Sequence, residues 1–352
     1  METSKLKIGI LYHKSSKKDS YNDRFAEILN FNKINYCWMN IDDDDFWEKL
    51  KTLDLFIFRY LIFDTPKQIA DIILPIIEKH YNIKVIPSQI NSWHYDDKIK
   101  EYYLSMSYNL PMVPSWIFWD RKKTIEWSKT VDYPIVFKLK GGASSTNVIL
   151  VKSKRKAIHL INKMFTSGIK SNKLPFFNST RYVDFKVKKW IRSIGSYIYK
   201  SILMEDAINS WKIHKNYIFF QKYLPNNDFD TRVTIIGNRA FAFMRHNRKG
   251  DFRSSGSGII DYNPKNIDLE IIKTAFEINR KINFQSMAFD FLYNEEHKPE
   301  FCEMSYTFVD YLVKNCEGYW DEDLTWHPGH FWPQYLQLMD MLNLPDLKQP
   351  DI

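Results

Sequence analysis

The stretch DTRVTIIGNRAFAFMRHNRKGDFRS, residues 230–254, decides the fold of this chain. Two apolar runs, Thr231–Ile236 and Ala240–Arg245, are joined by the pair Gly237-Asn238. A glycine and an asparagine between alternating apolar residues are typical of a tight hairpin turn. The sequence therefore predicts an antiparallel β-hairpin at the start of the last third of the chain.

Three arginines of this stretch are expected to lie together. Alternate residues of a strand share a face, so Asp230 and Arg232 should point the same way, with Arg245 joining them from the second strand. Arg253 follows in Gly250–Ser254, GDFRS. Three guanidinium groups at one place are costly unless anions neutralise them, and their fork suits phosphates and carboxylates. The sequence predicts an anion site here; a surface position for any one arginine is the alternative.

Two carboxylates further along indicate a metal site. Asp290 lies in Met287–Tyr293, Glu303 lies in Phe301–Ser305, and the polar turn Asn294–Lys298 separates these strand-like segments. Antiparallel pairing would bring the two acids together, and buried carboxylates need partners. Magnesium takes oxygen ligands from one or two carboxylates plus nucleotide phosphates. The alternative is a pair of structural acids bonded to nearby lysines or arginines.

Upstream, the expected order is a strand, a loop of small residues, a second strand and a helix, at Pro134–Lys138, Gly141–Asn147, Asn147–Val151 and Lys154–Phe165, after a helix from about Asp96 to Ser107. The loop reads GGASSTN. Small residues let backbone N–H groups approach phosphate oxygens, and Lys138 at the end of the first strand supplies a fixed positive charge. Taken alone, the loop also suits an ordinary hairpin.

The first ninety residues predict a small parallel sheet flanked by helices. The expected strands are Lys7–Tyr12, Asp54–Phe58 and Lys84–Ile86, and the expected helices are Asn22–Phe31 and Pro66–His80. No GxGxxG motif follows the first strand, which argues against a dinucleotide site. The acidic run Asp42–Asp45 is interpreted as the start of a helix, since carboxylates favour that end.

Length and composition favour a soluble protein of several subdomains. The chain has 352 residues, 44% of them hydrophobic and 26% charged, and exceeds the roughly 250–300 residues that one core supports. No run of about 18 apolar residues and no apolar leader region is present, so a cytoplasmic location is expected. Cys37, Cys302 and Cys316 are too far apart in the sequence for a metal knuckle, and their odd number argues against a disulfide framework.

The net charge of +8 is concentrated in one segment. From Lys152 to Lys215, fifteen lysines and arginines face three acids, a balance of +12. Such a segment attracts acidic molecules or anionic lipid heads, and a solvated lysine-rich surface is the alternative.

These motifs together resemble the ATP-grasp superfamily, and in particular the carboxylate-amine ligases that include the ribosomal-protein glutamate ligases and glutathione synthetases. The resemblance runs from about Asp96 to about Asp310, and GDFRS is its most specific local match. Two positions depart from the family: Gln221 stands where glutamate is usual, and Ser305 where asparagine is usual. The segment of about 167–217 looks like an insertion.

The resemblance implies an α/β (α+β) fold in three parts. They are an N-terminal Rossmann-like domain (residues 1–95), a lid subdomain carrying the basic insertion (96–224) and a C-terminal antiparallel-sheet subdomain (225–352). It also implies bound ATP and Mg²⁺, with Mn²⁺ as a substitute. The residues expected to bind nucleotide are Lys98, Lys138, Gly141, Gly142, Ser144, Ser145, Gln221, Lys222, Tyr223, Leu224 and Asn227. The expected catalytic residues are Arg232, Arg245 and Arg253, and the expected metal ligands are Asp290, Glu303 and Ser305.

The implied activity is an ADP-forming ligation of a carboxylate to an amine through an acyl phosphate. The basic insertion suggests an acidic substrate, such as an acidic sugar, nucleotide sugar or peptide, and also suits peripheral contact with a membrane; nucleic acid is not expected. The sequence leaves the oligomeric state open, a homodimer included. Two alternatives remain: phosphoryl transfer to a hydroxyl by the same fold, and a nonenzymatic polyanion-binding module on a degenerate ATP-grasp scaffold.

Overall fold

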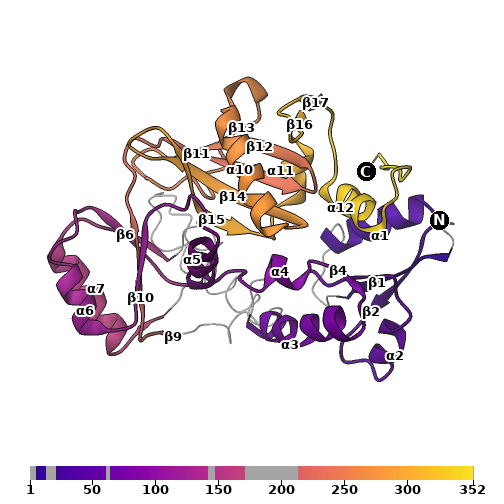
Figure 1. Ribbon diagram of the computed structural model, residues 1–352, viewed down its shortest axis with the longest axis horizontal. Helices are drawn as coiled ribbons and strands as arrows, with labels where there is room; N and C mark the ends of the chain where they lie inside the picture. The colour runs from indigo at the N-terminus through magenta and orange to yellow at the C-terminus, as the bar shows by residue number, and fades with distance from the viewer. Residues whose placement is uncertain (1–4, 13–20, 61–63, 142–146, 171–212, 352) are drawn as a thin grey trace, which may run out of the picture.

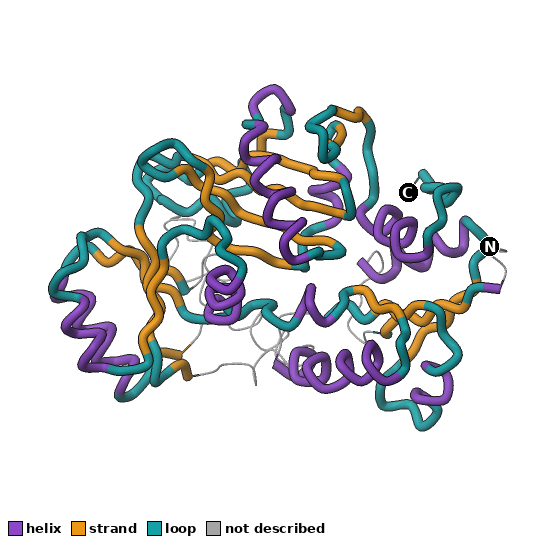
Figure 2. Tube along the Cα trace, in the orientation of Figure 1, coloured by secondary structure: helices purple, strands orange, loops and turns teal. Residues whose placement is uncertain are grey.

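The computed structural model describes residues 5–12, 21–60, 64–141, 147–170 and 213–351, which are arranged around three main β-sheets (Figures 1 and 2). One sheet is parallel and lies at the N-terminal end, one belongs to the lid, and the largest is built from the last third of the chain. This mixture confirms the predicted α/β class. Among the described residues, no helix has the length and apolar character needed to cross a membrane.

The N-terminal sheet is parallel with strand order β2-β1-β3-β4. Its strands are β1 (Lys7–Leu11), β2 (Asn35–Met39), β3 (Leu55–Ile57) and β4 (Lys84–Ile86). The helices around it are α1 (Tyr21–Phe31), α2 (Phe46–Leu50), α3 (Asp64–His80) and α4 (Gln89–Ser92). Apolar side chains of α1 and of α12 (Pro333–Leu342) pack on one face, and those of α2 and α3 pack on the other.

The lid sheet has the order β5-β10-β6-β7, and its described strand pairs are antiparallel. Its strands are β5 (Ser115–Phe118), β6 (Ile135–Lys138), β7 (Val148–Val151) and β10 (Ile218–Lys222). Helices α6 (Arg121–Trp127) and α7 (Lys154–Phe165) lie together beside it (Figure 1) and share its apolar core. β8 (Ile169–Lys170) pairs with β9 (Ile213–His214). Gly142, Ser144, Ser145 and most of the basic segment lie outside the described residues.

The C-terminal sheet is antiparallel in the order β15-β14-β11-β12-β16-β17, with β13 beside β12. Its strands are β11 (Phe229–Ile236), β12 (Arg239–His246), β13 (Ile260–Asp261), β14 (Ser286–Tyr293), β15 (Pro299–Ser305), β16 (Gly318–Trp320) and β17 (Trp326–Pro328). The remaining helical segments are α5 (Lys98–Ser107), the 3₁₀ turn η2 (Pro264–Asn266), α10 (Leu269–Ile282) and α11 (Asp310–Lys314).

The predicted hairpin is confirmed as β11 and β12, which pair along their whole length around Gly237. Gly237 has a φ of +57°, and a Cβ there would lie 2.3 Å from an Asp340 carboxylate oxygen. Glycine therefore serves both the turn and the contact with α12.

Most predicted elements are present within a residue or two of the expected bounds, and the acidic run Asp42–Asp45 does precede a helix, α2. The strands that were not predicted are β2, β5, β8, β9, β13, β16 and β17. The expected domain limits at 95/96 and 224/225 stay predictions.

Candidate active site

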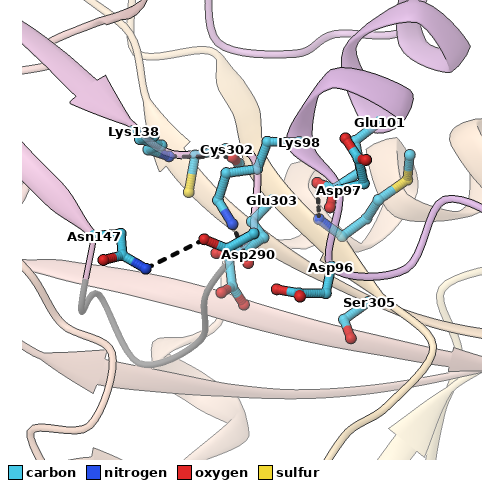
Figure 3. Close-up of polar contacts among 12 residues, drawn as sticks. Asp96, Asp97, Lys98, Glu101, Lys138, Asn147, Asp290, Cys302, Glu303 and Ser305 are labelled. Atoms are coloured by element: carbon cyan, nitrogen blue, oxygen red, sulfur yellow. Dashed lines mark hydrogen bonds and ion pairs between the residues drawn. The ribbon is translucent and has the colours of Figure 1, made fainter. Parts of the chain in front are cut away.

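Four charged side chains from separate parts of the chain gather where α5 and the lid sheet meet the C-terminal sheet (Figure 3). They are Lys98 on α5, Lys138 on β6, Asp290 on β14 and Glu303 on β15. The register of β14 and β15 places Asp290 directly opposite Glu303. Antiparallel pairing thus brings the two carboxylates together, as the sequence predicts.

The start of α5 is held firmly in place. Asp97 caps the helix by accepting hydrogen bonds from the Ile99 and Lys100 N–H groups. The Lys98 N–H donates to the Lys140 carbonyl at 2.8 Å, which ties the helix to the end of β6. Both candidate phosphate-binding lysines are therefore fixed to one junction.

Lys138 has donors to spare. Its side chain is buried, with 7% of the residue exposed, and within the described part of the chain its recorded contact is with the Cys302 carbonyl at 3.5 Å. An ammonium group has three N–H donors, and burying it without partners is costly. An anion bound beside Lys138 would supply the missing acceptors.

Lys98 is paired with Glu303 at 3.1 Å, and buried Glu101 lies one turn further along α5. Burial alone would lower the pKa of Lys98, but Glu303, Glu101 and Asp96 raise it. Burial raises the pKa of Glu101 to about 8, against the attraction of Lys98. At neutral pH, Glu101 is thus mostly a protonated acid, and Glu303 is the carboxyl group that contacts Lys98.

The raised pKa of Glu101 gives a prediction about stability. Folded Glu101 holds its proton up to about pH 8 and the unfolded group releases it near 4.5, so the wild-type protein loses stability as pH rises between these values. Glu101→Gln removes this loss and keeps an acceptor for the Met304 N–H. The variant should gain about 1–3 kcal/mol on wild type between pH 5 and pH 8.5 in urea unfolding. A difference independent of pH would contradict the assignment.

The arginines Arg232 and Arg245 are neutralised by the chain itself. Arg232 makes a two-pronged ion pair with Asp290, at 2.7 and 2.8 Å. Arg245 makes another with Asp230, at 2.7 and 2.6 Å, and also reaches Asp290 at 2.8 Å. Strand register therefore supplies the anions that these two arginines need, in the form of aspartate carboxylates.

This network fixes the charge of Asp290. Burial alone would raise its pKa, but the guanidinium groups of Arg232 and Arg245 hold it well below its usual range. Burial raises the pKa of Asp230 despite its pairing with Arg245. Asp290 therefore stays ionised at neutral pH and well below it.

Arg253 is the most accessible of the three arginines, with 34% of its side chain exposed. It pairs with Asp251 two residues earlier, through contacts of 2.8 Å from Nε and from a terminal nitrogen. Arg253 lies on the loop after β12, and its described ion pair is with Asp251 rather than with a member of the Arg232–Arg245 network. Of the three, it is the one best able to meet a substrate.

Five of the expected nucleotide-binding residues lie on β10 and just after it, in a segment that we call the hinge: Gln221, Lys222, Tyr223, Leu224 and Asn227. Gln221 is buried, and its amide nitrogen donates to Ser115 at 3.0 Å, which leaves the amide oxygen as an acceptor. Lys222 pairs with Glu295, and Leu224 is buried. Asn227 accepts the Tyr293 N–H at 2.8 Å, so its side chain also holds the end of β14.

A cavity of about 630 Å³ opens beside this hinge. Its lining brings residues of the hinge together with those of the loop after β12: Leu150, Tyr223, Asn226, Asn227, Asp228, His246, Asn247, Arg248, Lys249, Gly250, Asp251 and Phe252. Lys98, Lys138, Asp290 and Glu303 do not line it. The cavity thus joins two of the predicted nucleotide residues, Tyr223 and Asn227.

Gly141 marks the described end of the small-residue loop. A Cβ at this position would lie 3.1 Å from an Asp96 carboxylate oxygen and 3.3 Å from the Asp96 carbonyl, so the close approach favours glycine. Asn147 donates to the Gly141 carbonyl at 3.3 Å and closes the base of the loop.

The third predicted metal ligand, Ser305, is engaged in a backbone turn. Its hydroxyl lies 2.9 Å from the Thr307 carbonyl and 3.2 Å from the Thr307 N–H. Within the described residues, no group of three or more His, Cys, Asp or Glu side chains is arranged to hold a metal ion. A magnesium site at Asp290 and Glu303 therefore needs phosphate oxygens to complete it, as magnesium–nucleotide sites do.

Sequence reasoning missed two parts of this site. Glu101 was not singled out, although its position three residues after Lys98 puts both on one face of the helix. The Cys302 carbonyl is a main-chain group, so no side-chain pattern could have identified it as a partner of Lys138.

Comparison with solved structures identifies the fold. The macrocyclase MdnC of Microcystis aeruginosa, bound to its precursor peptide MdnA, aligns with a TM-score of 0.56 at 10% identity over 96% of this chain and 100% of its own. D-alanyl-alanine synthetase A of Vibrio cholerae aligns with a TM-score of 0.55 at 11% identity over 97% and 98%. An N5-carboxyaminoimidazole synthase of Aspergillus clavatus, in complex with ADP and 5-aminoimidazole ribonucleotide, gives 0.52 at 12% over 97% and 78%.

This chain therefore has the ATP-grasp fold, and the resemblance expected from its motifs is confirmed at that level. No protein-family model matches the chain, and no curated protein matches its sequence significantly.

Proposed function

We propose that this protein is an ATP-dependent ligase that joins a carboxylate to an amine and releases ADP and phosphate. The observation that carries the proposal is the meeting of Lys98 and Lys138 with Asp290 and Glu303 between the lid and C-terminal sheets. Lys98 and Glu303 balance each other, Asp290 is balanced by arginines, and Lys138 remains as a buried positive charge. A triphosphate would neutralise it.

The nucleotide base would lie at the hinge. The amide oxygen of Gln221 can still accept a hydrogen bond, and the cavity beside Tyr223 and Asn227 offers space next to it. The structural neighbour from Aspergillus clavatus holds ADP, which supports a nucleotide site in a fold of this kind.

The residues present fit magnesium. Glu303 keeps 37% of its side chain exposed and uses one oxygen on Lys98. Asp290 Oδ1 accepts one described hydrogen bond, from Arg232, and a carboxylate oxygen can accept two. Each acid can therefore offer an oxygen, and bound magnesium would draw charge from the transferring phosphoryl group. Arg232 and Arg245 would act here as positioning residues for Asp290.

In the proposed reaction, an oxygen of the substrate carboxylate attacks the γ-phosphorus of ATP, and the bond to the bridging oxygen breaks to give an acyl phosphate and ADP. The amine then attacks the acyl carbon, loses a proton and displaces phosphate. Lys98 and Lys138 would hold the phosphate charge, and Arg253 would hold the oxyanion that develops at the acyl carbon. Closure of the lid sheet would exclude water, which hydrolyses acyl phosphates.

We propose that one of the two substrates, either the carboxylate donor or the amine acceptor, is an acidic molecule that carries further negative charge. The support is the charge of +12 between Lys152 and Lys215. The compound itself and its attachment point are matters for experiment.

The direct test is a screen of carboxylates against amines, read out by ADP release and then by the mass of the product. The proposal expects ADP release that needs both substrates. It also expects a product whose mass equals the sum of the masses of the two substrates less that of one water. A phosphorylated hydroxyl compound as the product would instead establish phosphoryl transfer. Binding of acidic polymers with no binding of magnesium ATP would establish the nonenzymatic alternative.

Ser305→Asn tests the metal shell. An asparagine side chain can form the same turn with the Thr307 N–H that Ser305 forms, so the fold should persist. Its amide oxygen is also a better ligand than a hydroxyl. The magnesium concentration that gives half-maximal activity should therefore stay unchanged or fall, by up to about tenfold. Loss of activity with an unchanged melting temperature would show that the serine has a different task, such as contact with substrate.

A further inference from the structure

Strand β2 leaves one edge of the N-terminal sheet open. In the order β2-β1-β3-β4, nothing among the described residues pairs with its outer side. The other edge is covered: Gln285 donates to the Val85 carbonyl at 2.9 Å, and Lys84 reaches the Met341 carbonyl at 2.7 Å. An open strand edge is a template for pairing with another chain.

The hydrogen bonds to β1 show which groups of β2 face outward. The Tyr12 N–H donates to the Met39 carbonyl, so the main-chain groups of Met39 point toward β1. Because direction alternates along a strand, those of Cys37 and Asn35 do so too. The main-chain groups of Tyr36 and Trp38 therefore point away from the sheet.

The same edge carries exposed aromatic side chains. Tyr12 is 50% exposed and Trp38 is 39% exposed, and Trp38 makes edge contacts with both Tyr12 and Tyr36 at 6.3 Å. Cys37 between them is exposed as well. Open main-chain groups beside exposed aromatic rings are typical of an edge that a partner covers.

We propose that β2 pairs in antiparallel fashion with β2 of a second copy of this chain, across a twofold axis. Each strand runs from Asn35 to Met39, so the two strands overlap completely in only one antiparallel register. In that register the two Cys37 residues lie at the centre. In that register Tyr36 lies opposite the partner's Trp38, and their outward main-chain groups form the hydrogen-bonded pairs. The two sheets become one sheet of eight strands.

The flanking charges favour this pairing. Exposed Lys33 precedes the strand, and the exposed carboxylates Asp42, Asp43 and Asp44 follow it. Antiparallel pairing places the basic end of each strand beside the acidic end of its partner. A parallel arrangement would bring like charges together, and it cannot be made with a twofold axis across the edge.

The register also makes a covalent test available. The two Cys37 residues would be directly opposite in a non-hydrogen-bonded pair, with Cα atoms about 4.5 Å apart. That separation lies in the range of about 4.4–6.8 Å that a disulfide spans. Of the three cysteines, Cys302 and Cys316 are at least partly buried, so Cys37 is the one placed to react between copies.

The experiment is light scattering after gel filtration of the full chain from ~1 to ~100 µM, followed by oxidation with Cu(II)-phenanthroline, which takes up the two electrons released per disulfide. We expect a dimer that becomes covalent on oxidation and a Cys37→Ser dimer that does not. Wild-type protein that is monomeric throughout, or a dimer without the Cys37 crosslink, overturns the proposal.

Two variants separate this edge from other surfaces. Combined Tyr36→Lys and Trp38→Lys substitutions place lysines opposite one another across the pair and should give a folded monomer, with the folded state checked by circular dichroism. Ile72→Lys is the matched control, because Ile72 is 65% exposed on α3, which packs against β4 at the opposite edge. A double variant that stays dimeric also overturns the proposal.

Discussion

Replacement of Lys138 by methionine should lower ADP release at least 100-fold and remove most of the thermal stabilisation that magnesium ATP gives. Lys138 is buried at the end of β6, and its described contact is a single long one with the Cys302 carbonyl. Methionine keeps the length and apolar stem of the side chain but not its charge. The bound triphosphate would therefore lose a fixed positive group in a site from which water is excluded.

The variant should be at least as stable as wild type without nucleotide, because it removes a buried charge with few partners. This sign separates a binding role from a structural one: a structural ion pair would make the variant less stable. Lys152→Met, at an exposed position after β7, is the matched control and should bind nucleotide normally. Normal magnesium ATP binding by Lys138→Met would disprove the phosphate assignment.

The parts of the fold that were predictable depend on local patterns. The hairpin β11–β12 follows from two apolar runs around Gly237-Asn238, and β14–β15 follows from two strand-like segments around a polar turn. Strand β2 was not predicted, although Tyr36–Met39 is a short run of the aromatic and apolar residues that strands favour.

The partners of the charged residues were less predictable because they depend on register between distant strands. Asp230 was expected to point with Arg232, but which aspartate neutralises which arginine became clear only from the pairing of β11 with β12 and β14. The burial of Glu101 likewise depends on the packing of α5 against β15, about 200 residues away in the chain. Composition and spacing do not show how deeply a side chain is buried or which strand lies beside it.

The departures at Gln221 and Ser305 bear differently on function. The Gln221 amide is fixed by Ser115 with its oxygen left as an acceptor, so the hinge keeps its hydrogen-bonding capacity. The Ser305 hydroxyl is used by the turn at Thr307, which makes it a weaker metal ligand than the pattern alone indicates. The proposed magnesium site would therefore depend mainly on Asp290 and Glu303.

Replacement of Glu303 by glutamine should lower ADP release by about 100-fold or more, while the protein stays folded. Glutamine cannot ionise, so the proposed magnesium site loses one of its two carboxylates. Lys98 loses its partner at 3.1 Å, but Glu101 lies beside it and is protonated mainly because of burial. Without the negative charge of Glu303 nearby, Glu101 should ionise and become the new partner of Lys98, which preserves the fold.

This exchange of partners can be measured. In Glu303→Gln the pH-dependent loss of stability attributed to Glu101 should shift to lower pH, since the pKa of Glu101 falls when the neighbouring carboxylate is removed. Adding Glu101→Gln then removes both of these carboxylates, while Asp96 still acts on Lys98, and should cost more in urea unfolding than the two single changes added together. Glu300→Gln on the same strand is the control and should keep full activity. Turnover by Glu303→Gln at the wild-type rate would exclude Glu303 as a metal ligand, and additive stability effects would mean that Glu101 does not replace it.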